Sequence, residues 1–165
     1  MSVALTAQRS PNWLRILGVL FAVLGLLVAT YMSYAELTGQ ETSCPGATGE
    51  SFEGSIAVDC GLVQNSVYAK LLGIPVAIVG FGGYLAILAV WLLEDRVQLL
   101  REWGHMLVFG MALFGFLFTL YLTWAEFFRL QTVCTWCITS AVFMTLVFII
   151  SIIRLIQHFR QPASA

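Results

Sequence analysis

Residues 134–153 have the sequence CTWCITSAVFMTLVFIISII, twenty residues without a single Asp, Glu, Lys or Arg. An α-helix rises about 1.5 Å per residue, so a run of this length covers the roughly 30 Å hydrocarbon thickness of a bilayer. Three further charge-free runs of similar length precede it, at 16–34, 74–93 and 106–125. None of the four alternates apolar and polar residues, as the strands of a membrane barrel do. The sequence therefore predicts an all-α integral membrane protein, a bundle of four transmembrane helices.

The composition of the whole chain agrees with this prediction. Of its 165 residues, 59% are hydrophobic and only 10% are charged, and the net charge is −1. Soluble domains carry about 25% charged residues on average. These values argue against a water-soluble globule, a disordered chain and a nucleic-acid-binding protein. The chain is too short for two sizeable domains, so we expect residues 1–165 to form a single membrane domain.

The basic residues predict how the bundle is oriented. Six of the eight flank the runs on one side, and they are Arg9, Arg15, Arg96, Arg101, Arg154 and Arg160. Only Lys70 and Arg129 fall on the other side. Because Lys and Arg concentrate in cytoplasmic loops, both termini are expected in the cytoplasm. The long loop 35–73 and the short loop 126–133 are then expected on the outer face.

The first apolar run has an alternative interpretation as a cleaved signal peptide. Ser33-Tyr34-Ala35 weakly resembles a cleavage site with small residues. The apolar stretch is 19 residues long, whereas the core of a signal peptide has about 7–15. We therefore expect the run to remain as a membrane span.

The loop 35–73 divides into two parts. Its first half is rich in Gly and Ser and predicts irregular coil. Its second half, 60–72, predicts a short amphipathic helix on the membrane surface or over the bundle. The apolar residues at suitable spacing are Leu62, Val63, Val67, Tyr68, Leu71 and Leu72. Pro75 follows at the start of the second run, where a missing N–H costs least.

The four cysteines carry the chemistry that the sequence suggests. Cys44 and Cys60 lie in the long loop, and Cys134 and Cys137 form a C-T-W-C motif at the start of the last run. The predicted topology places all four on the outer face, which is the oxidising side of a bacterial inner membrane. This arrangement indicates thiol–disulfide chemistry or structural disulfides.

The C-x-x-C pair is the more specific of the two. A helix N-terminus carries about half a positive charge, which stabilises a thiolate, the species that attacks in disulfide exchange. A structural disulfide and a zinc site are alternatives, although the 15 residues between Cys44 and Cys60 do not suit a second zinc-binding pair. The loop pair alone is compatible with a static disulfide. Beside a C-x-x-C on the same face, a relay through a mixed disulfide is favoured.

Electrons that reach the C-x-x-C need an acceptor. The sequence contains no haem signature and no dinucleotide-binding glycine motif, so a lipid-dissolved quinone in an apolar pocket is the favoured acceptor. Aromatic residues near the motif are candidates for lining that pocket: Tyr121, Trp124, Phe127, Phe128 and Trp136. An aromatic belt at the membrane surface is the alternative for each of them.

The run CGLVQNSVYAKLLGIPVAIVG at 60–80, followed by CTWC at the start of the last helix, resembles the vitamin K epoxide reductase family. Members of this family have a loop Cys, a Ser six residues later, a Gly-Ile/Val-Pro before the next helix and a C-x-x-C in the last helix of a four-helix bundle. A different family of membrane disulfide generators has its two cysteine pairs in the opposite order along the chain, so the order found here favours the vitamin K epoxide reductase family. The resemblance covers all but the tails of the chain.

The resemblance implies a role for each cysteine. Cys134 and Cys137 are the redox pair beside the quinone, with Cys137 nearer to it, and Cys44 and Cys60 are the shuttle pair. Ser66 is the serine near the active site, although it is also a candidate helix cap. Bacterial relatives reoxidise a periplasmic thiol oxidase and reduce a quinone, menaquinone or ubiquinone, without a metal.

Two departures from the family pattern limit what is implied. Ala141 stands where animal members have Tyr, so vitamin K epoxide chemistry is not implied. The chain has no fused thioredoxin-like domain, so a separate thioredoxin-like partner is expected on the outer face. A membrane transporter for a soft metal such as mercuric ion is the alternative function, since paired thiolates favour soft metals.

Four polar side chains receive weaker predictions. Glu126 is favoured as a surface charge at a helix end, with proton acceptance as the alternative. Thr132 is predicted to cap the last helix. His105 and His158 are expected on the cytoplasmic side, away from the cysteines.

Overall fold

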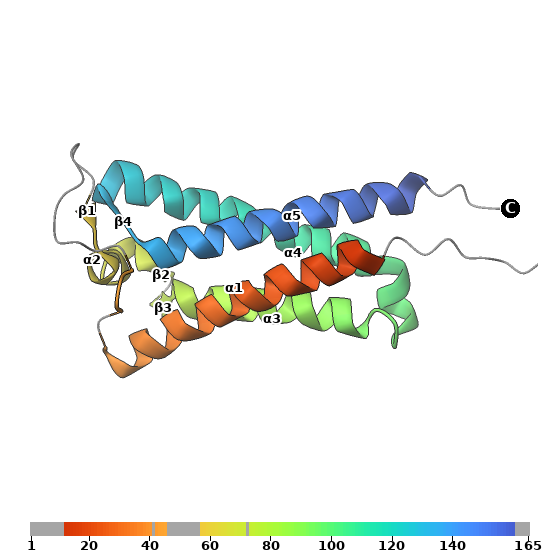
Figure 1. Cartoon of the computed structure of the whole chain (residues 1–165), viewed down its shortest axis with the longest axis horizontal. Helices are drawn as coiled ribbons and strands as arrows, with labels where there is room; N and C mark the ends of the chain where they lie inside the picture. Colours follow the sequence, from red (N-terminus) through yellow and green to blue (C-terminus); the bar gives the residue numbers. More distant parts are fainter. Residues whose placement is uncertain (1–11, 41, 46–56, 72, 161–165) are drawn as a thin grey trace, which may run out of the picture.

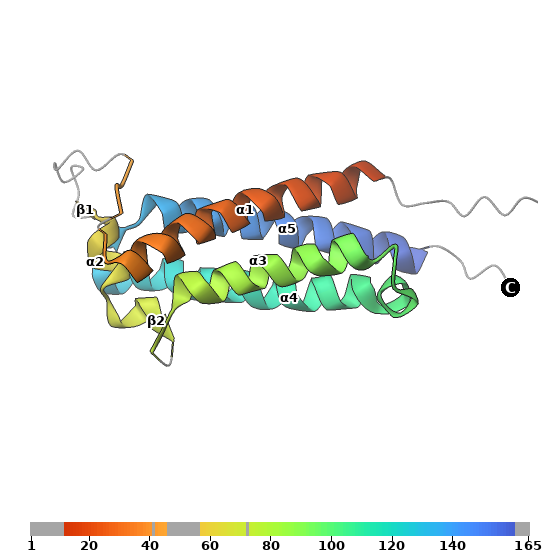
Figure 2. The same cartoon turned by 90° about the horizontal axis from the view of Figure 1, so that it is seen from below.

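Four long helices form a bundle in the computed structural model of the chain (Figures 1 and 2). The structure describes residues 12–40, 42–45, 57–71 and 73–160. The long helices are α1 (Asn12–Thr38), α3 (Val76–Leu93), α4 (Gln98–Ala125) and α5 (Thr135–Arg160). Each is long and apolar enough to cross a membrane. The predicted all-α, four-helix fold is confirmed.

Successive long helices run in opposite directions, so the bundle has two distinct ends. At the first, called the cysteine end, α1 finishes, α3 begins, α4 finishes and α5 begins (Figure 1). At the second, called the basic end, α1 begins, α5 finishes, and α3 turns into α4 over residues 94–97. The arginines described there are Arg15, Arg96, Arg101, Arg154 and Arg160. Both ends of the described chain therefore lie on the side opposite the four cysteines.

The helices extend beyond the charge-free runs that predicted them. The last run ends at Ile153, but α5 continues to Arg160, and α4 begins at Gln98 rather than at Met106. Backbone hydrogen bonding does not stop at a membrane surface, so a helix continues until a residue caps or breaks it. Gly39 follows the last residue of α1 and ends that helix with a left-handed backbone (φ 64°). Pro75 precedes the first residue of α3.

The long loop is less helical than predicted. The helix expected over 60–72 is only five residues long, α2 (Cys60–Gln64). The Asp59 carboxylate caps its start by accepting the N–H of Leu62 at 3.0 Å. A single 3-10 turn, η1 (Val67–Ala69), follows. A tight hairpin of β2 (Lys70–Leu71) and β3 (Ile74–Pro75) then turns through Gly73, whose positive φ of 84° suits glycine.

The predicted short helix is therefore present but covers only the first part of 60–72, because η1 and the β2–β3 hairpin take up the rest of the apolar spacing. Residues 46–56, the centre of the predicted coil, lie outside the described part of the chain. The loop expected at 126–133 is also mostly structured. It contains a π-helical turn, η2 (Glu126–Leu130), which continues α4, and a short strand, β4 (Thr132–Val133).

Two glycines of α1 allow aromatic rings of α3 to enter the core. A Cβ atom on Gly18 would lie 2.5 Å from the Trp91 ring, and one on Gly25 would lie 2.3 Å from the Tyr84 ring. Both rings are 1% exposed. Because the two glycines are seven residues apart, they lie on the same face of α1 and hold α1 close to α3.

A buried charged cluster joins the helices at the basic end. Arg154 of α5 donates to both oxygens of Glu94, at 3.1 and 3.3 Å, and His105 of α4 approaches the same carboxylate at 3.2 Å. Arg15 of α1 bonds Asp95 and the backbone oxygen of Trp91, each at 2.6 Å. The cluster fixes the bundle at the end remote from the cysteines.

Candidate functional site

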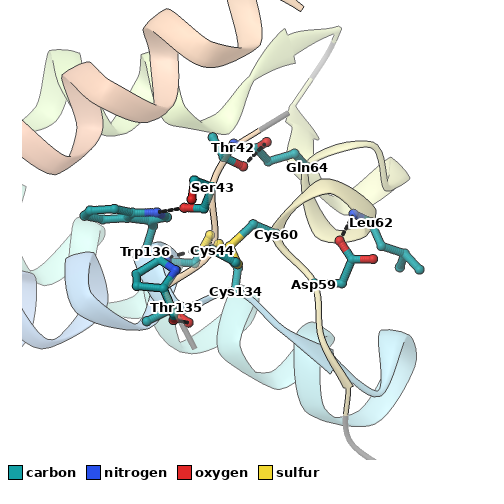
Figure 3. The surroundings of a disulfide bond; sticks show 12 residues. Thr42, Ser43, Cys44, Asp59, Cys60, Leu62, Gln64, Cys134, Thr135 and Trp136 are labelled. Atoms are coloured by element: carbon teal, nitrogen blue, oxygen red, sulfur yellow. Dashed lines mark hydrogen bonds between the residues drawn. A yellow bond between two sulfur atoms is a disulfide. The ribbon is translucent and has the colours of Figure 1, made fainter. Parts of the chain in front are cut away.

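All four cysteines meet at one end of the bundle. Cys44 and Cys60 form a disulfide with their Cα atoms 5.8 Å apart, while Cys134 and Cys137 are free thiols. Cys60 and Cys134 are almost completely buried, at 1% and 0% exposed, in one apolar cluster that also includes Met32. Figure 3 shows Cys134 beside the disulfide. The sequence left open which cysteines are paired, and in the structure the pair is Cys44–Cys60.

A short parallel strand pair brings Cys60 and Cys134 together. β1 (Ala57–Val58) pairs with β4, with Val58 opposite Val133, and the N–H of Asp59 donates to the Val133 oxygen at 3.3 Å. Each cysteine therefore follows closely after a paired segment. This pairing, between residues 75 positions apart, holds the Cys44–Cys60 disulfide next to the C-x-x-C.

The two residues inside the C-x-x-C hold the segment around Cys44. Trp136 donates its indole N–H to the Ser43 oxygen at 2.9 Å, and Thr135 donates its hydroxyl to the Pro45 oxygen at 3.1 Å (Figure 3). Cys44 is therefore anchored on both sides by the first turn of α5. The loop cysteine and the helix motif form one unit.

Cys134 occupies the N-cap position of α5. Its sulfur accepts the backbone N–H of Cys137 at 3.4 Å, a bond that a cap residue makes with the third residue of a helix. Thr132, the predicted cap, instead donates to the Leu130 oxygen at 3.1 Å, because α5 begins three residues later. The side-chain hydrogen bond with Cys137 lowers the pKa of the Cys134 thiol, although burial acts to raise it. This geometry favours a thiolate at Cys134.

A cavity of about 540 Å³ lies inside the bundle below the cysteines. Its wall is mostly apolar and is formed by all four long helices and the segment 63–69. Wall residues include Val28, Met32, Ser66, Gly83, Tyr84, Gly110, Phe118, Trp136, Cys137 and Ser140. Cys137 reaches the wall and Cys134 does not. The volume falls in the range of sites for small ligands, about 300–1,000 Å³.

The aromatic residues predicted to line a quinone pocket separate into two groups. Trp136 lies on the cavity wall. Tyr121, Trp124 and Phe127 are not part of that wall, and their side chains are 42–50% exposed. Trp124 stacks on Tyr121 and on Phe128, which is 72% exposed, with ring centroids 6.5 and 6.0 Å apart. These side chains lie on the outer face of α4 and η2 and point away from the cavity. Their contact with a quinone therefore stays a prediction.

Ser66 lies on the cavity wall but does not cap a helix with its side chain. Its hydroxyl donates to the Val63 oxygen at 2.7 Å, which leaves its oxygen lone pairs facing other groups. Ser66 therefore links α2 to the cavity wall, and among the described residues it makes no hydrogen bond to a cysteine.

Glu126 lies at the site, although the sequence favoured a position at the surface for it. It was expected as a surface charge, but it is 5% exposed, and its carboxylate accepts the N–H of Cys134 at 3.2 Å. The π-helical turn η2 and the left-handed backbone of Gln131 (φ 49°) fold the chain back so that Glu126 faces the cysteines. π-Helical turns often occur at functional sites, but they leave no periodicity in a sequence by which to find them.

The site thus consists of a disulfide and a C-x-x-C dithiol at one end of a bundle of four helices that are long and apolar enough to cross a membrane. A sequence model described as the vitamin K epoxide reductase family matches residues 16–152, most of the chain. The chain belongs to this family, as its sequence motifs predicted. Membership makes it a membrane oxidoreductase.

Proposed function

We propose that the protein oxidises the dithiol of a thioredoxin-like partner and passes the electrons to a membrane quinone. Electrons enter at the Cys44–Cys60 disulfide, move to Cys134 and Cys137, and leave to a quinone in the cavity. The activity supports disulfide bond formation in proteins outside the cytoplasm.

The observation that carries the proposal is the position of the four sulfurs relative to the cavity. The shuttle disulfide, the buried Cys134 and the cavity-lining Cys137 follow one another in space. With Cys44–Cys60 oxidised and Cys134 and Cys137 reduced, the structure corresponds to the state in which the electrons have reached the C-x-x-C. A quinone in the cavity would then meet Cys137 first.

The cavity suits a quinone as a substrate from the membrane. An apolar wall accommodates the ring and part of an isoprenoid tail, and hydroxyl groups such as that of Ser140 are available near Cys137 for the ring oxygens. Trp136 supplies an aromatic face on the same wall. We keep Tyr121, Trp124 and Phe127 as residues that contact the tail of the quinone from the lipid side.

The charges at the two ends support a location in the cell inner membrane. Five described arginines lie at the basic end, whereas Lys70 and Arg129 lie at the cysteine end. The positive-inside tendency therefore places the basic end and both termini in the cytoplasm. The cysteines then face the periplasm, where a thiol oxidase meets Cys44 and Cys60.

The test is anaerobic quinone reduction by a soluble dithiol, with purified protein in detergent. We expect the wild type to form quinol and Cys137→Ser to form none, because this variant lacks the thiol that reaches the cavity. Folded wild-type protein that forms no quinol would contradict the proposal. A thiol-dependent binding of mercuric ion by that protein would then favour the transporter alternative.

A further inference from the structure

Glu126 is an acid buried at the cysteine end without a cation to neutralise it. Its side chain is 5% exposed. Within the described residues, the ion pairs join Arg15 to Asp95 and join Arg154 and His105 to Glu94, all at the basic end. Burying an unpaired carboxyl group is costly, so such a group is uncommon unless its protonation is used.

The groups around Glu126 are those of the redox centre. One carboxylate oxygen, Oε2, accepts the N–H of Cys134 at 3.2 Å. The side chains of Glu126 and Cys137 both line the cavity, so the carboxyl group lies near the sulfur that is next to the cavity. Glu126 therefore faces both the redox centre and the cavity. The titratable groups that act on it are the thiols of Cys134 and Cys137.

We propose that Glu126 is the proton acceptor of the quinone-reducing step: it takes the proton of the Cys137 thiol and passes it to a quinone oxygen. The inference rests on the proposed function and assigns a residue to it. Its place next to the C-x-x-C and on the cavity wall distinguishes Glu126 from a residue that only shapes the site.

The step balances in atoms and electrons. The two thiols lose two electrons and two protons and form the Cys134–Cys137 disulfide, and the quinone gains both to become a quinol. One proton leaves the Cys137 sulfur as that sulfur donates electrons to the quinone, and Glu126 carries it to the ring oxygen. The second proton comes from solvent, which received it when the Cys134 thiol ionised, and the Cys134 thiolate then attacks the Cys137 sulfur to close the disulfide. Glu126 ends the cycle ionised, as it began.

Glu126→Gln separates proton transfer from support of the backbone. The amide oxygen of Gln still accepts the N–H of Cys134, but Gln does not take a proton. We expect the rate of quinol formation to fall by about 100-fold, the lower range for general acid–base catalysis. Glu126→Asp keeps a carboxylate with a shorter reach, and we expect a rate between those of wild type and Gln. Equal rates for Asp and Gln would overturn the proposal.

A second measurement needs no quinone. The rate at which N-ethylmaleimide labels Cys137 is followed by mass spectrometry at about pH 8.5. Because a carboxylate opposes ionisation of a neighbouring thiol, its loss in Glu126→Gln should speed labelling by about threefold or more. Slower quinone reduction together with faster labelling is the expected result.

The outcomes distinguish failure of the inference from failure of the proposed function. Wild-type turnover in Glu126→Gln would overturn the role of Glu126 while leaving quinone reduction in place. Slower turnover with unchanged labelling would assign Glu126 to structure alone and would also overturn the proposal. Folded wild-type protein that forms no quinol would reject both. Formation of the Cys44–Cys60 disulfide and the temperature of unfolding serve as folding controls.

Discussion

Trp136 donates its indole N–H to the backbone oxygen of Ser43 over 2.9 Å, so a residue between the two helix cysteines holds the neighbour of a loop cysteine. The same ring packs against Tyr31 of α1, with centroids 5.0 Å apart. A loop that carries a redox-active disulfide has to present it to two different partners. The hydrogen bond from Trp136 holds the loop against the bundle, where the proposed exchange between the loop disulfide and Cys134 takes place.

Replacing Trp136 with Phe removes the hydrogen bond and keeps most of the ring. A hydrogen bond of this kind contributes about 1 kcal/mol, which corresponds to roughly a fivefold change in an equilibrium. We therefore expect Trp136→Phe to speed reduction of the Cys44–Cys60 disulfide by excess soluble dithiol by up to about fivefold. Gel-shift labelling of the released thiols measures it. Trp103→Phe, at a ring that is 56% exposed near the basic end, is the matched control and should react as wild type does.

The strand pair β1–β4 predicts which mixed disulfide forms. In Cys137→Ser, Cys134 keeps its thiol but has no partner in the motif, so it attacks the shuttle disulfide and stays attached. We expect the Cys60–Cys134 bond, because these two buried residues lie together after Val58 and Val133. Non-reducing digestion and mass spectrometry identify it. A Cys44–Cys134 bond would contradict this assignment, and the double variant lacking both Cys134 and Cys137 should show Cys44–Cys60 alone.

Removing Cys134 should interrupt the relay at a different point. Cys134→Ser keeps Cys44 and Cys60, so their disulfide should still form and should still be reduced by a thioredoxin-like dithiol. Electrons then have no thiolate through which to leave the loop, and quinol formation should stop. Normal quinone turnover in this variant, measured by the absorbance of the quinone, would show that the relay order is wrong.

Much of the fold was predictable because hydrophobicity dominates it. The four charge-free runs predicted four spans, and each long helix contains nearly all of its run. The loop 60–72 was less predictable. Its apolar spacing fitted a helix, but Asp59, Gly73 and the pairing of β2 with β3 divide it into short elements. Local turn chemistry therefore outweighed periodicity over this segment.

The site was predictable as far as its cysteines and not beyond. Residue spacing identified the C-x-x-C and the loop pair, and the structure brings all four together. The burial of Glu126 depends on a π-helical turn and on the left-handed Gln131, which together reverse the chain over a few residues. Neither feature has a sequence pattern of its own. Four of the five aromatic residues chosen by nearness to the motif in sequence face outward, because the position of a residue around a helix decides its direction.

The cluster at the basic end should be essential for stability. In Arg154→Met, the Glu94 carboxylate loses both of its bonds from the guanidinium while it remains buried at 8% exposed. Breaking a buried ion pair by removing one partner costs about 3 kcal/mol or more. We expect the free energy of unfolding in detergent to fall by about that amount. Arg160→Met at the exposed end of α5 is the control, and restoring stability with Glu94→Gln in the Arg154→Met background would confirm the cause.

Filling the cavity should weaken quinone binding without unfolding the protein. Gly83 of α3 lies on the cavity wall, and a Cβ atom there would meet nothing within 4 Å, so Gly83→Leu places its side chain in the space proposed for the quinone. Gly82 is the neighbouring residue, equally free of contacts, but it is exposed and not on the wall. Both substitutions replace a helical Gly and should raise helix propensity by a similar amount.

We expect KM for quinone to rise by about tenfold in Gly83→Leu, equivalent to about 1.4 kcal/mol of lost binding, and to stay unchanged in Gly82→Leu. Steady-state kinetics at a saturating dithiol concentration measure the difference. Equal KM values in the two variants, with both folded, would mean that the quinone binds elsewhere, and the outward-facing aromatic residues Tyr121 and Trp124 would then be the next surface to test.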